Sequence, residues 1–172
     1  MVAHTLVVGG TGMLSGLCEA LAGDGGRLSL LSRQASGPDG FACDYYDPAA
    51  FLAALDAAVA RSGPINLAVA WFHTLKIEAP RLLAERVKGR LFQVLGSAAA
   101  DPSHPWRLET AQKVAEGLPG CDLRQVVLGF QIEAAGSRWL THDEISDGVL
   151  DAVRSDRALT IIGQTKPWSA KP

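Results

Sequence analysis

Short apolar runs alternate with stretches of helical periodicity along most of this chain of 172 residues. The first run covers residues 4–8, is rich in β-branched side chains, and leads through glycines into a helical pattern with Leu17, Ala20 and Leu21 on one face. Further strands are predicted at 27–31, 40–43, 65–70, 90–95, 123–128 and 158–162. Helical spacing between them predicts helices over about 48–59, 76–87, 106–116 and 142–154.

Strands that alternate with helices are typical of a parallel sheet that is covered on both faces. We therefore expect an α/β protein, a doubly wound Rossmann parallel sheet of about seven strands in the order 3-2-1-4-5-6-7. Two helix starts carry clear signals: Asp47 precedes Pro48, and Thr141 forms a capping box with Glu144. No linker, repeat or low-complexity segment divides the sequence, so we expect a single domain over residues 1–172.

Composition and charge narrow the class of protein. Hydrophobic residues make up 48% of the chain, enough for an ordinary core, and the net charge of −2 lacks the basic field of nucleic-acid-binding proteins. No apolar run approaches the roughly 20 residues of a membrane helix, and the chain enters a strand rather than a signal peptide. Its three cysteines stand apart, without zinc-ligand spacing. We expect a cytoplasmic protein that binds no nucleic acid, membrane or metal.

A glycine-rich turn between the first strand and the first helix predicts a nucleotide site. The turn reads Gly9-Gly10-Thr11-Gly12-Met13-Leu14. Glycine has no Cβ, so it permits the tight turn and a close approach of the backbone to a pyrophosphate. The helix that begins there points unpaired N–H groups and the positive end of its dipole at the same place. We expect the pyrophosphate of a dinucleotide to lie over Thr11 to Leu14.

This loop resembles the GxxGxxG turn of the short-chain dehydrogenase/reductase family, with Ser15 in the place of the third glycine. The loop is most similar to that of small bacterial members whose turn reads GGTGMLSG. The segment Asp44-Tyr45 resembles the stretch after the third strand of that family. The resemblance implies that the aspartate holds the adenine amino group, and it implies an NAD(P)-binding Rossmann domain over the whole chain.

Two further segments resemble the nicotinamide side of the family's site. Gly96-Ser97 ends the fifth predicted strand, where the family has its substrate-orienting serine. The segment from Gly129 to Ile132 is similar to the one that touches the nicotinamide after the sixth strand. The resemblance therefore adds Gly96, Ser97, Gly129 and Ile132 to the cofactor-binding residues. A loop serine that caps its turn is the alternative for Ser97.

The end of the second predicted strand favours NADP(H) over NAD(H). An NAD site usually carries an acidic residue there, about 20 residues after the glycine loop. This chain has Ser32-Arg33 at that place. A guanidinium pairs with a 2′-phosphate but finds no partner on a bare 2′-hydroxyl. A solvated arginine at a strand end is the alternative.

The catalytic pair of the family has no counterpart at its usual place. The reductases carry a tyrosine and a lysine four residues apart on the helix after the fifth strand. The only two tyrosines here, Tyr45 and Tyr46, follow the third predicted strand, and the corresponding stretch runs from Glu109 to Lys113. A carboxylate is a poor proton donor at neutral pH. We therefore predict no ordinary tyrosine-dependent carbonyl reduction.

Two functions of different classes stay open. The first is an NADPH-dependent oxidoreductase with another acid, with His73 as one candidate, or with an acceptor that needs no strong acid, such as a flavin or quinone. The second is a non-enzymatic NADP(H)-binding redox sensor or partner-binding module. The stretch 137–141 is either a lid over the nicotinamide end or an ordinary connection. The small-molecule acceptor stays unknown, and a homo-oligomer stays open.

Overall fold

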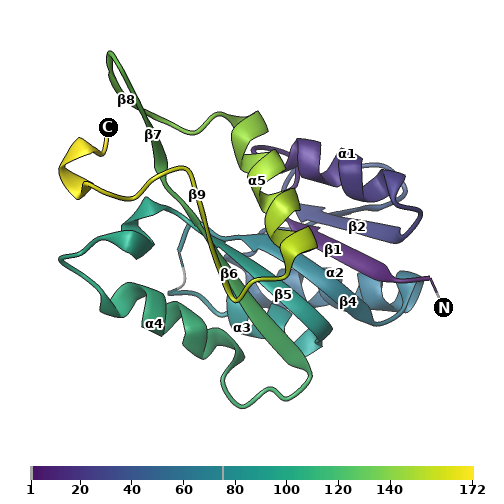
Figure 1. Cartoon of the computed structure of the whole chain (residues 1–172). Coiled ribbons are helices and arrows are strands. Elements are labelled where there is room, and N and C mark those ends of the chain that lie inside the picture. Colours follow the sequence, from purple (N-terminus) through teal and green to yellow (C-terminus); the bar gives the residue numbers. More distant parts are fainter. Residues whose placement is uncertain (1, 75) are drawn as a thin grey trace.

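A computed structural model describes residues 2–74 and 76–172 of the chain. Its centre is a parallel sheet of seven strands in the order β3-β2-β1-β4-β5-β6-β9 (Figure 1). The order 3-2-1-4-5-6-7 predicted from the sequence is confirmed, with β9 as the seventh strand of this sheet. The strands are β1 (His4–Val8), β2 (Arg27–Ser32), β3 (Gly40–Ala42), β4 (Ile65–Trp71), β5 (Val87–Leu95), β6 (Cys121–Leu128) and β9 (Leu159–Ile162).

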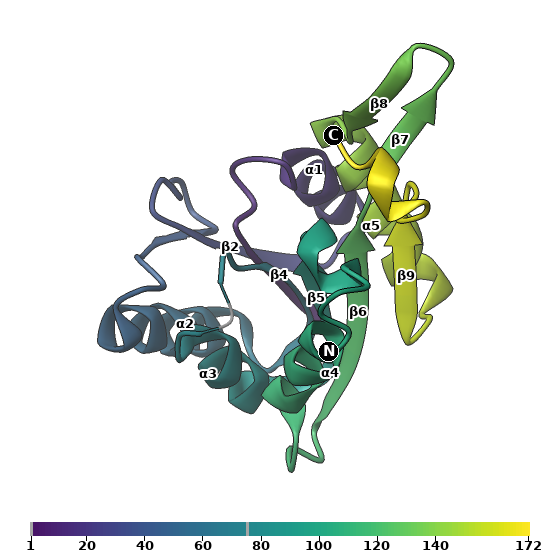
Figure 2. The same ribbon diagram turned by 90° about the vertical axis from the view of Figure 1, so that its left-hand side faces the viewer.

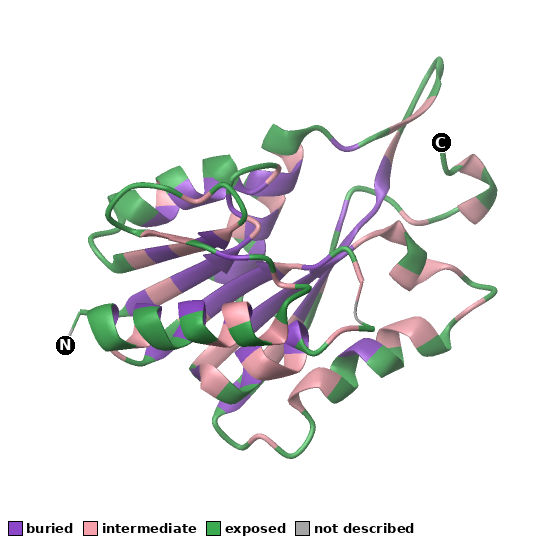
Figure 3. Ribbon diagram, turned by 180° about the vertical axis from the view of Figure 1, so that it is seen from behind, coloured by how far each residue is buried: buried purple, intermediate pink, exposed green. Residues whose placement is uncertain are grey.

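Helices cover both faces of this sheet. Figures 1 and 2 show α1 (Ser15–Gly23) and α5 (His142–Ser155) on one face, with α2 (Pro48–Ser62), α3 (Ala79–Arg86) and α4 (Trp106–Gln112) on the other. Alternate residues of β1 serve the two layers: Leu6 and Val8 join the cluster under α2 and α3, while Val7 joins the cluster under α1 and α5. The central strands are consequently the most buried part of the molecule (Figure 3).

Two boundaries on the α3–β5 segment differ from the sequence prediction. The helix begins at Ala79 instead of near residue 76, because Pro80 has no N–H to donate and fits only the first turn. It ends at Arg86, and the strand begins at Val87 instead of residue 90. The β-branched Val87 adopts an extended backbone and pairs with Ile65 of β4. The predicted helix over 106–116 likewise stops at Gln112 and continues as a short 3-10 turn.

A hairpin that the sequence analysis did not predict follows β6. Strands β7 (Phe130–Glu133) and β8 (Gly136–Trp139) pair antiparallel and project from the sheet (Figures 1 and 2). The connecting residues 134–135 are both alanine and lack the usual Asn-Gly turn signal. The C-terminal tail returns to this hairpin, where the Lys171 ammonium lies 5.9 Å from the ring of Trp139 and 5.0 Å from that of Trp168.

None of the helices in the described ranges has the length and apolar character that crossing a membrane would require.

Candidate functional site

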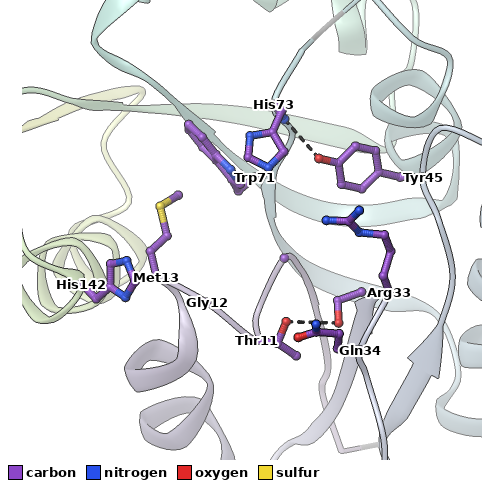
Figure 4. A pocket seen from close by; sticks show the side chains of 11 residues that line it. Thr11, Gly12, Met13, Arg33, Gln34, Tyr45, Trp71, His73 and His142 are labelled. Atoms are coloured by element: carbon purple, nitrogen blue, oxygen red, sulfur yellow. Dashed lines mark hydrogen bonds between the residues drawn. The ribbon is translucent and has the colours of Figure 1, made fainter.

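A cleft of about 370 Å³ opens at the carboxyl end of the parallel strands, between the glycine loop and the end of β2. This edge of a doubly wound sheet is where such folds bind ligands. Figure 4 shows side chains from five segments of the chain around the cleft. The residues that line it are Gly9, Thr11, Gly12, Met13, Ser32, Arg33, Gln34, Tyr45, Trp71, His73 and His142.

The glycine loop adopts the backbone that a close approach to phosphate requires. Gly9 has a φ of +82°, and its N–H donates to the Leu31 carbonyl over 3.0 Å. A Cβ on Gly10 would lie 2.7 Å from the Cys18 sulfur, so this glycine lets the loop pack on its own helix. A Cβ on Gly12 would meet nothing within 4 Å, so the protein leaves open space beside this residue, which lines the cleft.

Part of the N-terminus of α1 is free to meet an anion at this loop. The Ser15 N–H donates to the Gly12 carbonyl over 3.0 Å, whereas the next first-turn N–H groups have no acceptor one turn back in the helix. The N-cap Leu14 provides no side-chain hydrogen bond, and the first turn carries no acidic residue. Helix α5 supports the loop from outside, where the Ser146 hydroxyl donates to the Met13 carbonyl over 2.9 Å. A Cβ on Gly16 would lie 3.2 Å from Ser146, so the two helices meet closely here. This combination suits a pyrophosphate.

Polar and cationic groups gather where β2 ends. The Thr11 hydroxyl donates to the Ser32 hydroxyl over 3.3 Å, which ties the glycine loop to this strand end. Arg33 follows directly, and its guanidinium points into the cleft toward Tyr45 (Figure 4). Gln34 completes this side of the cleft. The corner therefore offers hydroxyl, amide and guanidinium donors and no carboxylate.

An aromatic side chain forms the opposite wall of the cleft. The Tyr45 hydroxyl accepts a hydrogen bond from the His73 N–H over 3.4 Å, and its ring meets Phe72 edge to face at 5.2 Å. Burial raises the pKa of Tyr45 above its ordinary value, so the phenol stays protonated at neutral pH. Asp44, expected to hold an adenine amino group, is exposed and accepts the Tyr46 N–H over 3.0 Å; it does not line the cleft.

Trp71 lies across the middle of the sheet edge. A Cβ on Gly9 would lie 3.5 Å from the Trp71 Cβ, and one on Gly96 would lie 3.5 Å from its Cη2. The indole therefore spans the gap between the end of β1 and the end of β5. Its side chain lines both the cleft of the glycine loop and a second cavity beyond it, and His73 does the same. These two side chains form the shared wall.

The residues expected on the nicotinamide side divide between two places. Gly96, Ser97 and Gly129 line a cavity of about 210 Å³ together with Trp139 and Ile145. Ile132 lies on the projecting hairpin, 38% exposed, and lines none of the cavities described here. Leu14, assigned to the nucleotide loop, is fully buried in the core under α1, so only its backbone can face a ligand.

The stretch that corresponds to the family's catalytic pair lies elsewhere. Glu109 and Lys113 line a cavity with Cys121 and Gln125, near the amino end of β6. Neither of them lines the cleft of the glycine loop or the cavity beyond Trp71.

Three residues that line the cleft were not predicted from the sequence to be site residues: Gln34, Trp71 and His142. Trp71 had a signal, because it is the last residue of a strand next to the glycine-loop strand, and ligands bind at that edge. Gln34 follows Arg33 directly. His142 had none, since only the packing of α5 against α1 brings its first residue to the cleft.

The fold is similar to that of solved oxidoreductases. A metagenomic short-chain oxidoreductase in complex with NADP aligns at 18% identity with a TM-score of 0.66, covering 94% of this chain and 96% of that one. A short-chain dehydrogenase/reductase from Brucella ovis with a partially ordered NAD aligns at 16% identity with a TM-score of 0.63, covering 95% and 100%. The 3-alpha-hydroxysteroid dehydrogenase from Pseudomonas sp. B-0831 complexed with NADH aligns at 16% identity with a TM-score of 0.65. The alignment covers 95% of this chain and 96% of that one.

No family model and no curated protein matches the chain in sequence. The structural likeness covers nearly the whole length on both sides of each alignment. It agrees with the parallel order of the seven strands and with a glycine loop between β1 and α1. The chain therefore has the fold of the short-chain dehydrogenases/reductases.

Proposed function

We propose that this chain is a single NAD(P)-binding domain of the short-chain dehydrogenase/reductase type, and that it works as an NADP(H)-dependent oxidoreductase without the usual tyrosine–lysine pair. The observation that carries the proposal is the cleft itself. An uncapped helix N-terminus and an open glycine backbone lie on one side of it, with Arg33 on another. Structures of similar fold are described in complex with NADP, NADH and partially ordered NAD, which supports a nicotinamide dinucleotide here.

Different residues of the cleft would bind different parts of the dinucleotide. The backbone of Thr11 to Leu14 would hold the pyrophosphate, and Ser32 and Arg33 would hold the ribose and its 2′-phosphate. The Tyr45 ring would pack on the adenine side, since it lines the cleft beside Arg33 (Figure 4). The cofactor, when bound, supplies the hydride chemistry. The chain itself orients the nucleotide and excludes water around it.

A second candidate function is a non-enzymatic NADP(H)-binding module that responds to the redox state of the nucleotide. One observation favours it: both tyrosines follow β3, and Glu109 and Lys113 line a different cavity from the cleft. A protein that kept the nucleotide site but lacks this pair beside it would bind the cofactor without turning it over. Multiple-turnover NADPH oxidation with any acceptor would exclude this candidate.

Calorimetric titration with NADPH tests the shared part of both functions. Gly12→Val should abolish binding, because the branched side chain would enter the space that the phosphates need. The fold should survive, since a Cβ there meets nothing within 4 Å. Gly23→Val is the matched control: its Cβ also meets nothing, and it lies at the far end of α1. Unchanged NADPH binding by a folded Gly12→Val protein would show that the loop does not hold the phosphates.

A further inference from the structure

A second cavity of about 490 Å³ lies beside the nucleotide cleft, beyond the wall of Trp71 and His73. Its volume falls within the range of roughly 300–1,000 Å³ that small-molecule sites occupy. Its walls come from the end of β4, the end of β5 and the exposed side of α4. None of the residues assigned to the pyrophosphate or the ribose lines it. The cavity is a place for a second molecule next to the nucleotide.

The interior of this cavity is apolar and partly aromatic. Leu95, Ala98, Ala99 and Ala111 form much of its lining, with Phe72 and Trp71 on the β4 side. Gly96 adds no side chain to the lining, and its Cβ position lies 3.5 Å from the Trp71 Cη2. Trp106 lines the cavity while 53% of its surface is exposed to solvent. An exposed indole at the mouth of an apolar cavity favours a flat aromatic body as the occupant.

Cations and no carboxylates border the cavity. Lys76 and Arg107 line it, and among the lining residues there is neither Asp nor Glu. Within the described ranges 2–74 and 76–172, Lys76 forms no ion pair. Side chains of both types are positively charged at neutral pH. The border of the cavity therefore favours an anion.

Arg107 is held in place with donors to spare. Its Nη1 donates to the Ala98 carbonyl over 3.3 Å, and its Cζ lies 5.8 Å from the centre of the Trp106 ring. The nearest carboxylate, Asp101, lies 3.9 Å from Nη1. That carboxylate already accepts from the Ser103 N–H and bonds the His104 ring. A guanidinium has five N–H donors in a planar fork, so most of them stay free for a carboxylate.

We propose that this cavity binds an aromatic carboxylate, with its ring against Trp106 and the apolar walls and its carboxylate at Arg107 and Lys76. This position lies next to the nucleotide cleft, so the compound would be a second ligand beside the bound nucleotide, and in that respect the inference rests on the proposed function. The binding site itself stands on the cavity and its charges alone.

The test uses 2-naphthoate and its neutral counterpart 2-naphthamide as probes, titrated into the full-length protein with and without saturating NADPH. The carboxylate should bind and the amide should bind at least about tenfold more weakly, the usual effect of losing a hydrogen bond to a charged group. Arg107→Gln and Lys76→Gln should each weaken naphthoate binding by about tenfold. Lys88→Gln, an exposed lysine at the other end of β5, should not change it.

A space-filling variant separates the two sites. Thr110 lines the cavity from an exposed position on α4, so Thr110→Phe should fill the cavity without disturbing the core. Naphthoate binding should be lost in this variant while NADPH binding stays unchanged. NADPH binding to the wild type without naphthoate binding would overturn this inference and leave the proposed function intact. If Arg107→Gln weakens naphthoate binding but the protein binds no NADPH, this inference would stand and the proposed function would be overturned. Equal affinity for the amide would overturn the assignment of an anion.

Discussion

The hydroxyl groups of Thr11 and Ser32 lie 3.3 Å apart, although one belongs to the glycine loop and the other ends the second strand. This hydrogen bond joins the proposed pyrophosphate position to the proposed ribose position. Arg33 follows Ser32 directly, so its guanidinium enters the cleft from the side of the ribose. The choice between the two nicotinamide dinucleotides therefore depends on this corner.

We predict that NADP(H) binds more tightly than NAD(H) and that Arg33→Ala removes most of the difference. Loss of a charged, hydrogen-bonded contact costs about 1.5–3 kcal/mol, which corresponds to roughly tenfold to 150-fold in affinity. Calorimetric titration of both cofactors into both proteins measures this. NAD(H) affinity should hardly change in the variant, since a bare 2′-hydroxyl gives the guanidinium no ionic partner. Equal affinity of the wild type for the two cofactors would contradict the prediction.

We predict that the protein reduces ketones and aldehydes weakly at best, while flavins or quinones are reduced more readily. General acid catalysis contributes about 10²–10⁴-fold, and neither tyrosine lies on the helix after β5. Hydride transfer to a stacked flavin or quinone depends more on proximity than on an acid. An NADPH-oxidation screen with both groups of acceptors measures the difference.

The controls for this screen are Ser97→Ala and His73→Gln. Ser97 lines the cavity at the end of β5, and His73 lines the nucleotide cleft. Residual carbonyl reduction should fall in one of these variants if that side chain serves the proton transfer. Robust carbonyl reduction, with a kcat of order 1 s⁻¹, that neither substitution affects would mean that a different proton donor acts.

Trp71 should report nucleotide binding through its fluorescence. Its indole spans Gly9 and Gly96 and lines the cleft, so a bound nicotinamide group would come into contact with it. We expect NADP⁺ to quench tryptophan emission and Trp71→Phe to lose most of this quenching. Trp168→Phe serves as the control, because Trp168 lies in the C-terminal tail beside Lys171. Full quenching in the Trp71→Phe protein would place the nicotinamide away from this wall.

His4 should make the protein less stable as the pH falls below about 6.5. Its side chain is 1% exposed, with Nδ1 2.8 Å from the Gly63 carbonyl and Nε2 2.9 Å from the Ser29 hydroxyl. Burial lowers the pKa of His4 below its ordinary value of 6.5. Below pH 6.5 the unfolded chain takes up a proton that the native state does not, so the free energy of unfolding decreases until the pH reaches the native pKa.

Urea unfolding between pH 8 and pH 5 measures this effect. One such histidine gives a slope of at most about 1.4 kcal/mol per pH unit. His4→Gln should be less stable at pH 8 but should show a smaller slope, since it has no imidazole to protonate on unfolding. His142→Gln, at an exposed histidine, should keep the slope of the wild type. A slope in His4→Gln equal to that of the wild type would refute the assignment.

The sequence by itself determined the sheet and one end of the site. Apolar runs such as residues 4–8 and 65–70 identified the central strands, because a strand buried on both faces must be apolar along its length. The glycines after residue 8 marked the nucleotide loop, because a positive φ at Gly9 and close packing at Gly10 exclude larger side chains. These are local requirements, and local sequence reveals them.

The tertiary structure alone decided what surrounds that loop. Trp71 acquires its place only when β4 lies beside β1, and His142 only when α5 packs on α1. The β7–β8 hairpin turns Ile132 outward, away from the cavity that holds Gly129. Likewise, Lys76 and Arg107 border one cavity although they lie 31 positions apart in the sequence. Such contacts depend on the register of paired strands and on how helices far apart in the chain pack together. A short pattern of residues does not encode either of these.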